Sequence, residues 1–219
     1  MPPKQPGKSA ATGYHNSVFI NCPFDDGYKQ LFQATVFTVL YCGRDPRSAL
    51  EIYNSGQVRI EKIFRLIEAC RFGIHDISRT EPDADSGLPR FNMPLELGIF
   101  LGAQRFGTRR HKTKNCLILD REPYRYQQFM SDISGQDISA HDGDPTALIS
   151  NVRDWLNTVA STRPLPSGSA IATRFAVFQT DIPAICATLH LVPSELTFVD
   201  YGHVIRIWLE QQAAASLPA

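Results

Sequence analysis

Residues 17–43 read SVFINCPFDDGYKQLFQATVFTVLYCG, and they contain one complete unit of strand, turn and helix. The apolar run 18–20 predicts a buried strand, because parallel strands covered on both faces have continuous apolar sequences. The aspartates that follow are suited to cap a helix. From Tyr28 to Leu40 the apolar residues recur at helical spacing, so they form one stripe that faces a core. Gly43 then ends the helix.

The same alternation of strand and helix continues through residue 159. Further strands are predicted at 48–52, 72–77 and 116–119, and further helices at 60–70, 94–103 and 145–159. Strands that alternate with helices pair in parallel through right-handed crossovers. The sequence therefore predicts an α/β fold, an open parallel sheet of four to five strands with helices on both faces.

Composition changes at both ends of this region. Residues 1–16 are rich in Pro, Gly and Ser and poor in apolar side chains, so they are predicted to form a disordered leader. The α/β domain is assigned to residues 17–160 and a Pro- and Ser-containing linker to 161–170. Residues 171–219 are predicted to form a small C-terminal helical appendage, with helices at 181–190 and 194–212. The aromatic stripe of the second helix is expected to pack on the sheet domain or on a partner.

Charge and composition exclude several classes of protein. The chain carries 22 Lys and Arg against 22 Asp and Glu, so it lacks the basic excess of a dedicated nucleic-acid binder. No apolar run reaches the roughly 18 residues that span a bilayer, and no secretory signal is recognisable, so a cytoplasmic protein is expected. The five widely spaced cysteines predict free thiols rather than disulfides or a metal site. Neither a Gly-x-Gly-x-x-Gly nor a Walker-type loop is present, which disfavours a redox dinucleotide cofactor and P-loop chemistry.

Polar side chains gather after the predicted strands. Ligands of open parallel sheets bind at the carboxyl ends of the strands, which selects the segments 21–28, 75–79 and 120–122. The candidate ligand-binding residues there are Asn21, Cys22, Pro23, Phe24, Asp25, Tyr28, His75, Asp76 and Ser78. For the aspartates of the first segment helix capping is the alternative, and for Phe24 and Tyr28 it is a place in the core.

Four arginines are further candidates. Arg47, Arg59, Arg79 and Arg90 would each suit a pyrophosphate through bidentate contact, although surface ion pairing is the ordinary role of an arginine.

Glu96 is the only ionisable residue between Met93 and Ala103. A helix of this composition is expected to be buried, and an unpaired buried carboxylate costs several kcal/mol. Glu96 is therefore predicted to be hydrogen-bonded, protonated or functional, and capping of the first helical turn is the structural alternative. Gly98 and Gly102 predict either close packing on the sheet or a floor for a flat ligand group beside Glu96.

Three stretches carry a resemblance to known families. Val18 to Phe24, Ile74 to Ser78 and Asn92 to Gly98 resemble the bacterial TIR-like proteins and the related nucleoside 2-deoxyribosyltransferase-like enzymes, over about residues 17–160. The resemblance implies a flavodoxin-like sheet. It also implies that Glu96, in the pattern Asn-x-x-x-Glu-Leu-Gly that starts at Asn92, is the catalytic carboxylate of an enzyme that cleaves N-glycosidic bonds. The implied substrates are NAD for TIR-like enzymes and deoxynucleosides for the transferases.

One carboxylate suits this chemistry. As the base leaves, the ribosyl carbon gains oxocarbenium character, which an ionised glutamate stabilises or traps covalently. The cationic nicotinamide of NAD leaves as a neutral molecule and needs no proton, whereas the base of a deoxynucleoside needs a donor, for which His75 and Asp76 are the candidates. NAD hydrolysis is thus the main hypothesis, with NAD as substrate and no other cofactor. Nucleoside cleavage or transfer, and a non-catalytic module that binds a nucleotide signal or scaffolds partners, are the alternatives.

The resemblance further implies a role in bacterial antiphage defence that is controlled by oligomerisation. The expected contact is with a second copy of the chain, or with a partner defence protein, through the C-terminal appendage.

Overall fold

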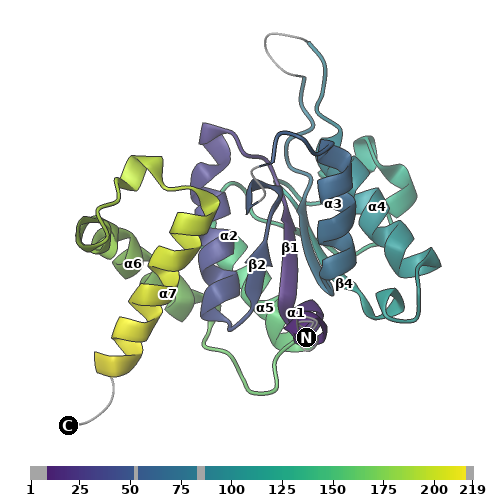
Figure 1. Cartoon of the computed structure of the whole chain (residues 1–219). Helices are drawn as coiled ribbons and strands as arrows, with labels where there is room; N and C mark the ends of the chain where they lie inside the picture. Colours follow the sequence, from purple (N-terminus) through teal and green to yellow (C-terminus); the bar gives the residue numbers. More distant parts are fainter. Residues whose placement is uncertain (1–8, 52–53, 83–86, 216–219) are drawn as a thin grey trace, which may run out of the picture.

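The computed structural model describes residues 9–51, 54–82 and 87–215. Its centre is a five-stranded, wholly parallel sheet in the order β2-β1-β3-β4-β5 (Figure 1). The strands are β1 (Ser17–Asn21), β2 (Asp45–Arg47), β3 (Phe72–Asp76), β4 (Asn115–Asp120) and β5 (Ile138–Ala140). The predicted α/β, flavodoxin-like fold is confirmed. Strand order reverses between β1 and β3, which places the expected ligand site at the carboxyl ends of these two strands.

Helices cover both faces of the sheet. They are α1 (Ser9–Asn16), α2 (Lys29–Tyr41), α3 (Arg59–Ala69), α4 (Asn92–Phe106), α5 (Pro145–Val159), α6 (Gly168–Thr188) and α7 (Phe198–Ala215). Successive side chains of a strand point to opposite faces. Accordingly Val18 and Ile20 of β1 join the core with α2 and α5, whereas Phe19 joins the core with α3 and α4.

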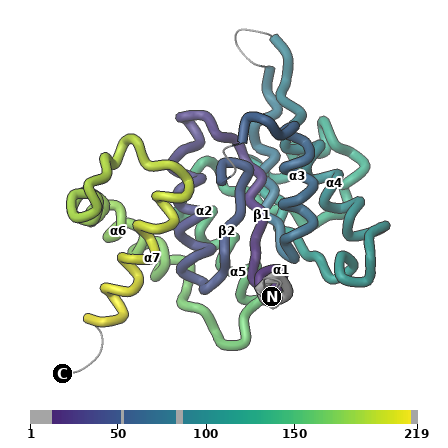
Figure 2. The backbone as a smooth tube through the Cα atoms, in the orientation of Figure 1, coloured from purple at the N-terminus to yellow at the C-terminus, as the bar shows by residue number. Residues whose placement is uncertain are grey.

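The C-terminal helices form an additional layer outside α2 and α5 (Figures 1 and 2). On α2 the ring of Phe37 lies 5.2 Å from that of Phe178 on α6 and 5.8 Å from that of Trp208 on α7, measured between centroids. All three side chains are buried in one core cluster together with residues of β1, β3 and β4. The aromatic stripe of α7 therefore packs on the sheet domain.

Helix α6 begins earlier than the sequence predicts. It starts at Gly168, inside the predicted linker 161–170, because the Ser167 hydroxyl caps it by accepting a hydrogen bond from the Ala170 amide. The helix then continues through Pro183 to Thr188, so the predicted start at residue 181 is wrong.

The leader and the second strand also differ from the predictions. Residues 1–8 of the predicted disordered leader lie outside the described residues. The remainder of the leader forms α1, so the prediction of disorder is wrong for that part. The Tyr14 ring holds α1 in place because it is buried against Arg110, whose guanidinium lies 3.9 Å from the ring centroid. The predicted strand 48–52 is wrong as well. The strand β2 ends at Arg47, and the 3₁₀ turn η2 (Ala49–Glu51) follows because the Glu51 carboxylate folds back onto the Arg47 guanidinium.

Helix α4 is buried on one face only. Leu97 and Phe100 point into the core, but Leu95 is 56% exposed. A Cβ added at Gly98 or Gly102 would contact nothing within 4 Å. The close packing predicted for these glycines is therefore wrong, whereas the ligand floor, which needs open space, stays a prediction. A helix in the outer layer of an α/β sandwich can bury only the stripe that faces the sheet.

Within the described residues, no helix combines the length and the apolar composition that crossing a membrane requires.

Candidate functional site

A cavity of about 210 Å³ lies at the carboxyl ends of β1 and β3, where the strand order reverses. Ten of the residues that the sequence singles out line it, and they are Asn21, Cys22, Pro23, Phe24, Asp25, Arg59, Arg79, Arg90, Asn92 and Glu96. Met93 is the other described lining residue. Four predicted site residues, Tyr28, His75, Asp76 and Ser78, lie outside this lining and are buried.

Glu96 is 8% exposed and reaches the cavity from α4. The helix begins at Asn92 rather than at Pro94, so Glu96 lies in the second turn, beyond the amides that a first-turn carboxylate would cap. The capping alternative is thus wrong. Burial raises the pKa of Glu96 to about 7, and the nearby charge of Arg59 opposes this increase. A carboxyl group with this pKa changes its charge close to neutral pH.

Asn21 connects the strand ends to the start of α4. Its side-chain amide donates a hydrogen bond to the Met93 carbonyl at 2.9 Å and lies 3.0 Å from Nδ1 of His75. Because β1, β3 and the first turn of α4 meet at this amide, Asn21 fixes the position of the helix that carries Glu96.

His75 is fully buried between aromatic rings. Its ring centroid lies 5.8 Å from that of Phe19 and 4.9 Å from that of Phe100. Gly73 makes this arrangement possible, because a Cβ there would lie 2.7 Å from Nε2 of His75. Burial lowers the pKa of His75 to about 3, so the ring is neutral at pH 7. Its full burial, its place outside the cavity lining and its low pKa argue against the role of proton donor that the sequence suggested.

Asp76 is also fully buried, and it holds a polar cluster together. Its carboxylate accepts hydrogen bonds from the Tyr28 hydroxyl and, at 2.9 Å, from the Ser78 amide. Nε2 of His141 lies 2.9 Å from the same carboxylate, within ion-pair distance but off the line of a hydrogen bond. Because these contacts tie together the chain segments that follow β1, β3 and β5, Asp76 stabilises the edge of the sheet and does not face the cavity.

Three of the four candidate arginines converge on the cavity. Arg59, Arg79 and Arg90 line it, whereas Arg47 is bound to Glu51. Arg79 forms an ion pair of 3.1 Å with Asp25, and both side chains are partly exposed, so this pair is weak and open to exchange. Three guanidinium groups face two carboxylates, which favours an anionic ligand.

Cys22 also lines the cavity, but its thiol is no nucleophile at neutral pH. The side chain is 3% exposed, and burial together with the charges of Asp76 and Glu96 raises its pKa well above the ordinary value. The protonated thiol contributes shape and apolar surface to the cavity.

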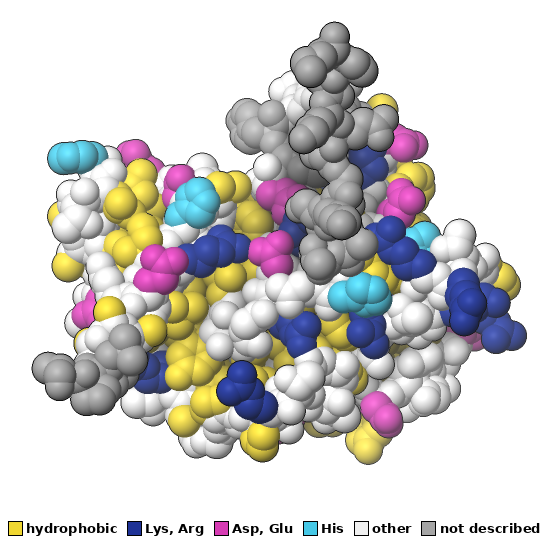
Figure 3. Space-filling view, turned by 60° about the horizontal axis from the view of Figure 1, so that its bottom comes forward, with side chains coloured by type: hydrophobic (Ala, Val, Ile, Leu, Met, Phe, Trp, Pro, Cys, Tyr) yellow, Lys and Arg dark blue, Asp and Glu magenta, His cyan; other side chains and the backbone are white. Residues whose placement is uncertain are grey.

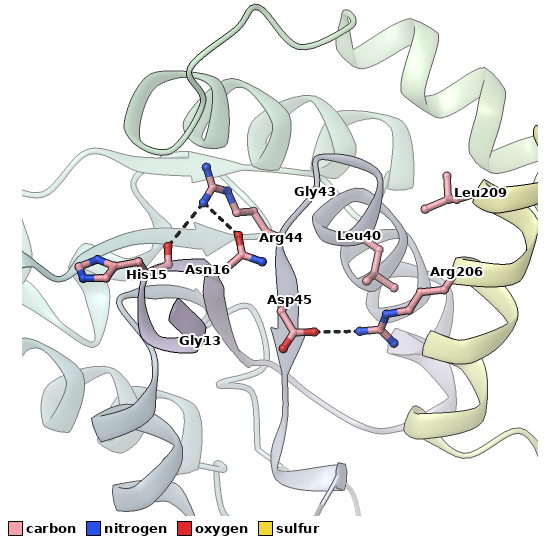
Figure 4. A pocket seen from close by; sticks show the side chains of 9 residues that line it. All are labelled: Gly13, His15, Asn16, Leu40, Gly43, Arg44, Asp45, Arg206 and Leu209. Atoms are coloured by element: carbon pink, nitrogen blue, oxygen red, sulfur yellow. Dashed lines mark hydrogen bonds and ion pairs between the residues drawn. The ribbon is translucent and has the colours of Figure 1, made fainter. Parts of the chain in front are cut away.

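A larger open hollow of about 750 Å³ lies at the opposite, amino-terminal edge of the sheet (Figure 4). Its charged side chains bind one another or the backbone. Arg206 pairs with Asp45 at 2.8 Å, and Arg44 donates to the Asn16 side chain at 3.1 Å. Because parallel sheets bind ligands at the carboxyl ends of their strands, we assign the candidate site to the smaller cavity with Glu96.

The amino-terminal edge of the sheet faces forward in Figure 3. Lys and Arg side chains occur there in several places, one of them a group at the right-hand edge, with uncharged side chains between the places and with Asp and Glu scattered over the same face. On the coloured part of this face the charges thus form no continuous basic stripe of the kind that binds nucleic acid.

Among the described residues, no group of three or more His, Cys, Asp or Glu side chains is placed to hold a metal ion. All five cysteines are free. Neither a protein-family model nor a curated protein nor a solved structure matches the chain.

Proposed function

We propose that this chain hydrolyses NAD at the bond between nicotinamide and ribose, with Glu96 as the carboxylate that stabilises the ribosyl cation. The observation that carries the proposal is the position of Glu96. It is a buried carboxylate in a small cavity at the switch point of the sheet, faced by three arginines. The resemblance of residues 17–160 to TIR-like proteins supports the same reaction.

The proposed reaction needs no proton donor. When the glycosidic bond breaks, its electron pair moves to the ring nitrogen of nicotinamide, which leaves neutral, and the anomeric carbon becomes an oxocarbenium centre. The ionised Glu96 stabilises this centre or forms a transient ester with it, and water completes the hydrolysis with release of one proton. Arg59, Arg79 and Arg90 supply the charge to bind the pyrophosphate.

The charge of the substrate assists Glu96. With a pKa of about 7, roughly half of the carboxyl groups are ionised in the ligand-free protein at neutral pH. The cationic nicotinamide ring favours the ionised form, since an opposite charge nearby lowers the pKa of a carboxyl group.

NAD suits this site better than a deoxynucleoside. The leaving base of a deoxynucleoside requires a proton, and the two donors considered from the sequence, His75 and Asp76, are fully buried outside the cavity. The arginines that line the cavity match a ligand with phosphate groups, which a free nucleoside lacks.

Nicotinamide release from NAD by the purified full chain tests the proposal. We expect Glu96→Gln to reduce the rate at least about 100-fold, which is comparable to the effect of removing one hydrogen-bond donor to the transition state in other enzymes. Glu61→Gln makes the same change at an exposed position of α3 and should leave the rate unchanged. Equal release by the wild type and Glu96→Gln would refute the assignment, and NAD binding without release by either would support the nucleotide-binding module instead.

Control by self-association and a role in antiphage defence belong to the same proposal, and both rest on the resemblance alone. A rate per molecule that increases with protein concentration would support control by self-association, and a constant rate would contradict it.

A further inference from the structure

We infer that the site has two parts, and that a second cavity beside Phe24 binds the purine nucleotide half of a dinucleotide whose reacting ribose lies at Glu96. This inference rests on the proposed function and extends it to a subsite that the C-terminal helices help to form. The second cavity has a volume of about 240 Å³. It lies between the start of α2, the turn η2 and the segment that joins the turn η6 (Pro193–Glu195) to α7.

The two cavities are adjacent. Phe24 and Asp25 line both of them. Separately, each is smaller than the roughly 300 Å³ at which sites for drug-sized ligands begin, whereas together they exceed that volume. A ligand with two linked halves therefore fits this arrangement better than a compact one.

Aromatic side chains form the wall of the second cavity. The ring of Phe32 lies 5.5 Å from that of Phe24 and 5.9 Å from that of Phe198, measured between centroids. Phe24 is 40% exposed, which leaves part of its ring available to a ligand. Aromatic faces of this kind stack on nucleobases, and the carboxylate of Asp26, which also lines the cavity, is able to accept a hydrogen bond from an exocyclic amine or a ribose hydroxyl.

The C-terminal helices hold this wall in place. The Tyr201 hydroxyl of α7 donates a hydrogen bond of 3.4 Å to the Gln33 carbonyl of α2, and both residues line the cavity. Tyr201 is 4% exposed and its ring contacts Phe178 of α6. The wall is therefore part of the packed core rather than a separate flap.

Arg79 and Lys29 lie near the junction of the two cavities, together with the carboxylates of Asp25 and Asp26. Arg79 reaches over Gly27, where an added Cβ would lie 2.7 Å from the guanidinium, and it pairs with Asp25 on the shared edge. Lys29 lines the second cavity. The pyrophosphate of a dinucleotide that spans both cavities would pass this junction. There Arg79 could exchange its contact with Asp25 for one with a phosphate at a small cost in free energy, because the pair is exposed.

The test compares ligands that fill one or both cavities. Binding of AMP to the full chain is measured by calorimetry, and nicotinamide release is followed with NAD and with nicotinamide mononucleotide, which lacks the purine half. Leu50→Glu places a carboxylate in the second cavity at a position that is 42% exposed, and Val199→Glu places one outside it at a position that is 43% exposed. Phe198→Ala removes an aromatic wall without adding charge.

We expect Leu50→Glu and Phe198→Ala to weaken AMP binding about tenfold and to lower kcat/KM for NAD by a similar factor. Val199→Glu should change neither, and no variant should change kcat/KM for the mononucleotide. Leu50→Glu keeps the test decisive if Phe198→Ala unfolds, since Leu50 lies at the surface.

Two outcomes are distinguishable. AMP binding that Leu50→Glu and Val199→Glu affect equally would overturn the second subsite, whether or not NAD is cleaved. Specific loss of AMP binding in Leu50→Glu, combined with no nicotinamide release by the wild type, would support the subsite and refute the proposed reaction.

Discussion

Replacing Glu96 by Gln should stabilise the folded chain at pH 8 and leave its stability unchanged near pH 4. The carboxyl group has a pKa of about 7 in the folded chain, raised by burial, and an ordinary value of 4.5 once unfolding exposes it. Between these two pH values the unfolded chain has lost the proton that the folded chain still holds. The free energy of unfolding therefore falls as the pH rises from about 4.5 to about 7, and above 7 the whole penalty is present.

The size of the penalty follows from the two pKa values. At about 1.4 kcal/mol per pKa unit their difference corresponds to about 3 kcal/mol, with the opposing effect of Arg59 already included. The amide of Gln is nearly isosteric but is also polar and buried, so we expect Glu96→Gln to increase the free energy of unfolding by about 1 to 3 kcal/mol at pH 8. The increase should fall below about 0.5 kcal/mol near pH 4.5.

Urea unfolding followed by circular dichroism at several pH values between 4.5 and 8 measures this directly. Glu61→Gln, at an exposed position of α3, is the matched control and should change the free energy of unfolding by less than about 0.5 kcal/mol at every pH. A stabilisation by Glu96→Gln that is independent of pH, or a loss of stability at pH 8, would refute the reasoning from burial. This result would not depend on whether the chain is an enzyme.

Three further predictions concern other parts of the molecule. If ionised Glu96 is required, kcat/KM for NAD should rise about tenfold per pH unit below pH 7 and level off above it, because kcat/KM reports the ionisation of the free enzyme. A value of kcat/KM that falls as the pH rises would indicate a general acid instead. The ammonium of Lys114 is buried and donates hydrogen bonds to the Ile67 and Cys70 carbonyls at the end of α3. Lys114→Met should therefore lower the free energy of unfolding by about 2 to 3 kcal/mol, and Lys112→Met, at an exposed position, is the control. Phe37→Ala should cost about 3 to 5 kcal/mol in urea unfolding because its ring joins α2 to the C-terminal helices, and a loss below 1 kcal/mol would show that these helices dock independently.

Local sequence patterns predicted most of the fold. The predicted helix at 145–159 has the bounds that the structure gives, because its apolar stripe is regular, and the structure adds that Asp144 caps the first amides. The short strand β2 was placed a few residues too late, since three residues carry too little pattern to separate a strand from the turn that follows it. The predicted start of helix α6 at residue 181 is too late, since the helix begins at Gly168 and continues through Pro183, which tertiary packing of its apolar face tolerates in the interior.

The sequence by itself determined most of the helices and strands, that the sheet is parallel, and that Glu96 is an isolated carboxylate in an apolar helix, but it did not predict α1 or β5. Each of these properties depends on residues that are close together in the sequence, so the spacing of apolar and charged residues is enough to predict it. Only the tertiary structure decided that His75 and Asp76 are buried, that Arg59, Arg79 and Arg90 meet at one cavity, and that Phe198 forms a wall beside Phe24. Such proximity depends on strand order and on how the C-terminal helices pack against α2. Both bring together residues that lie far apart in the chain, and no local pattern encodes that.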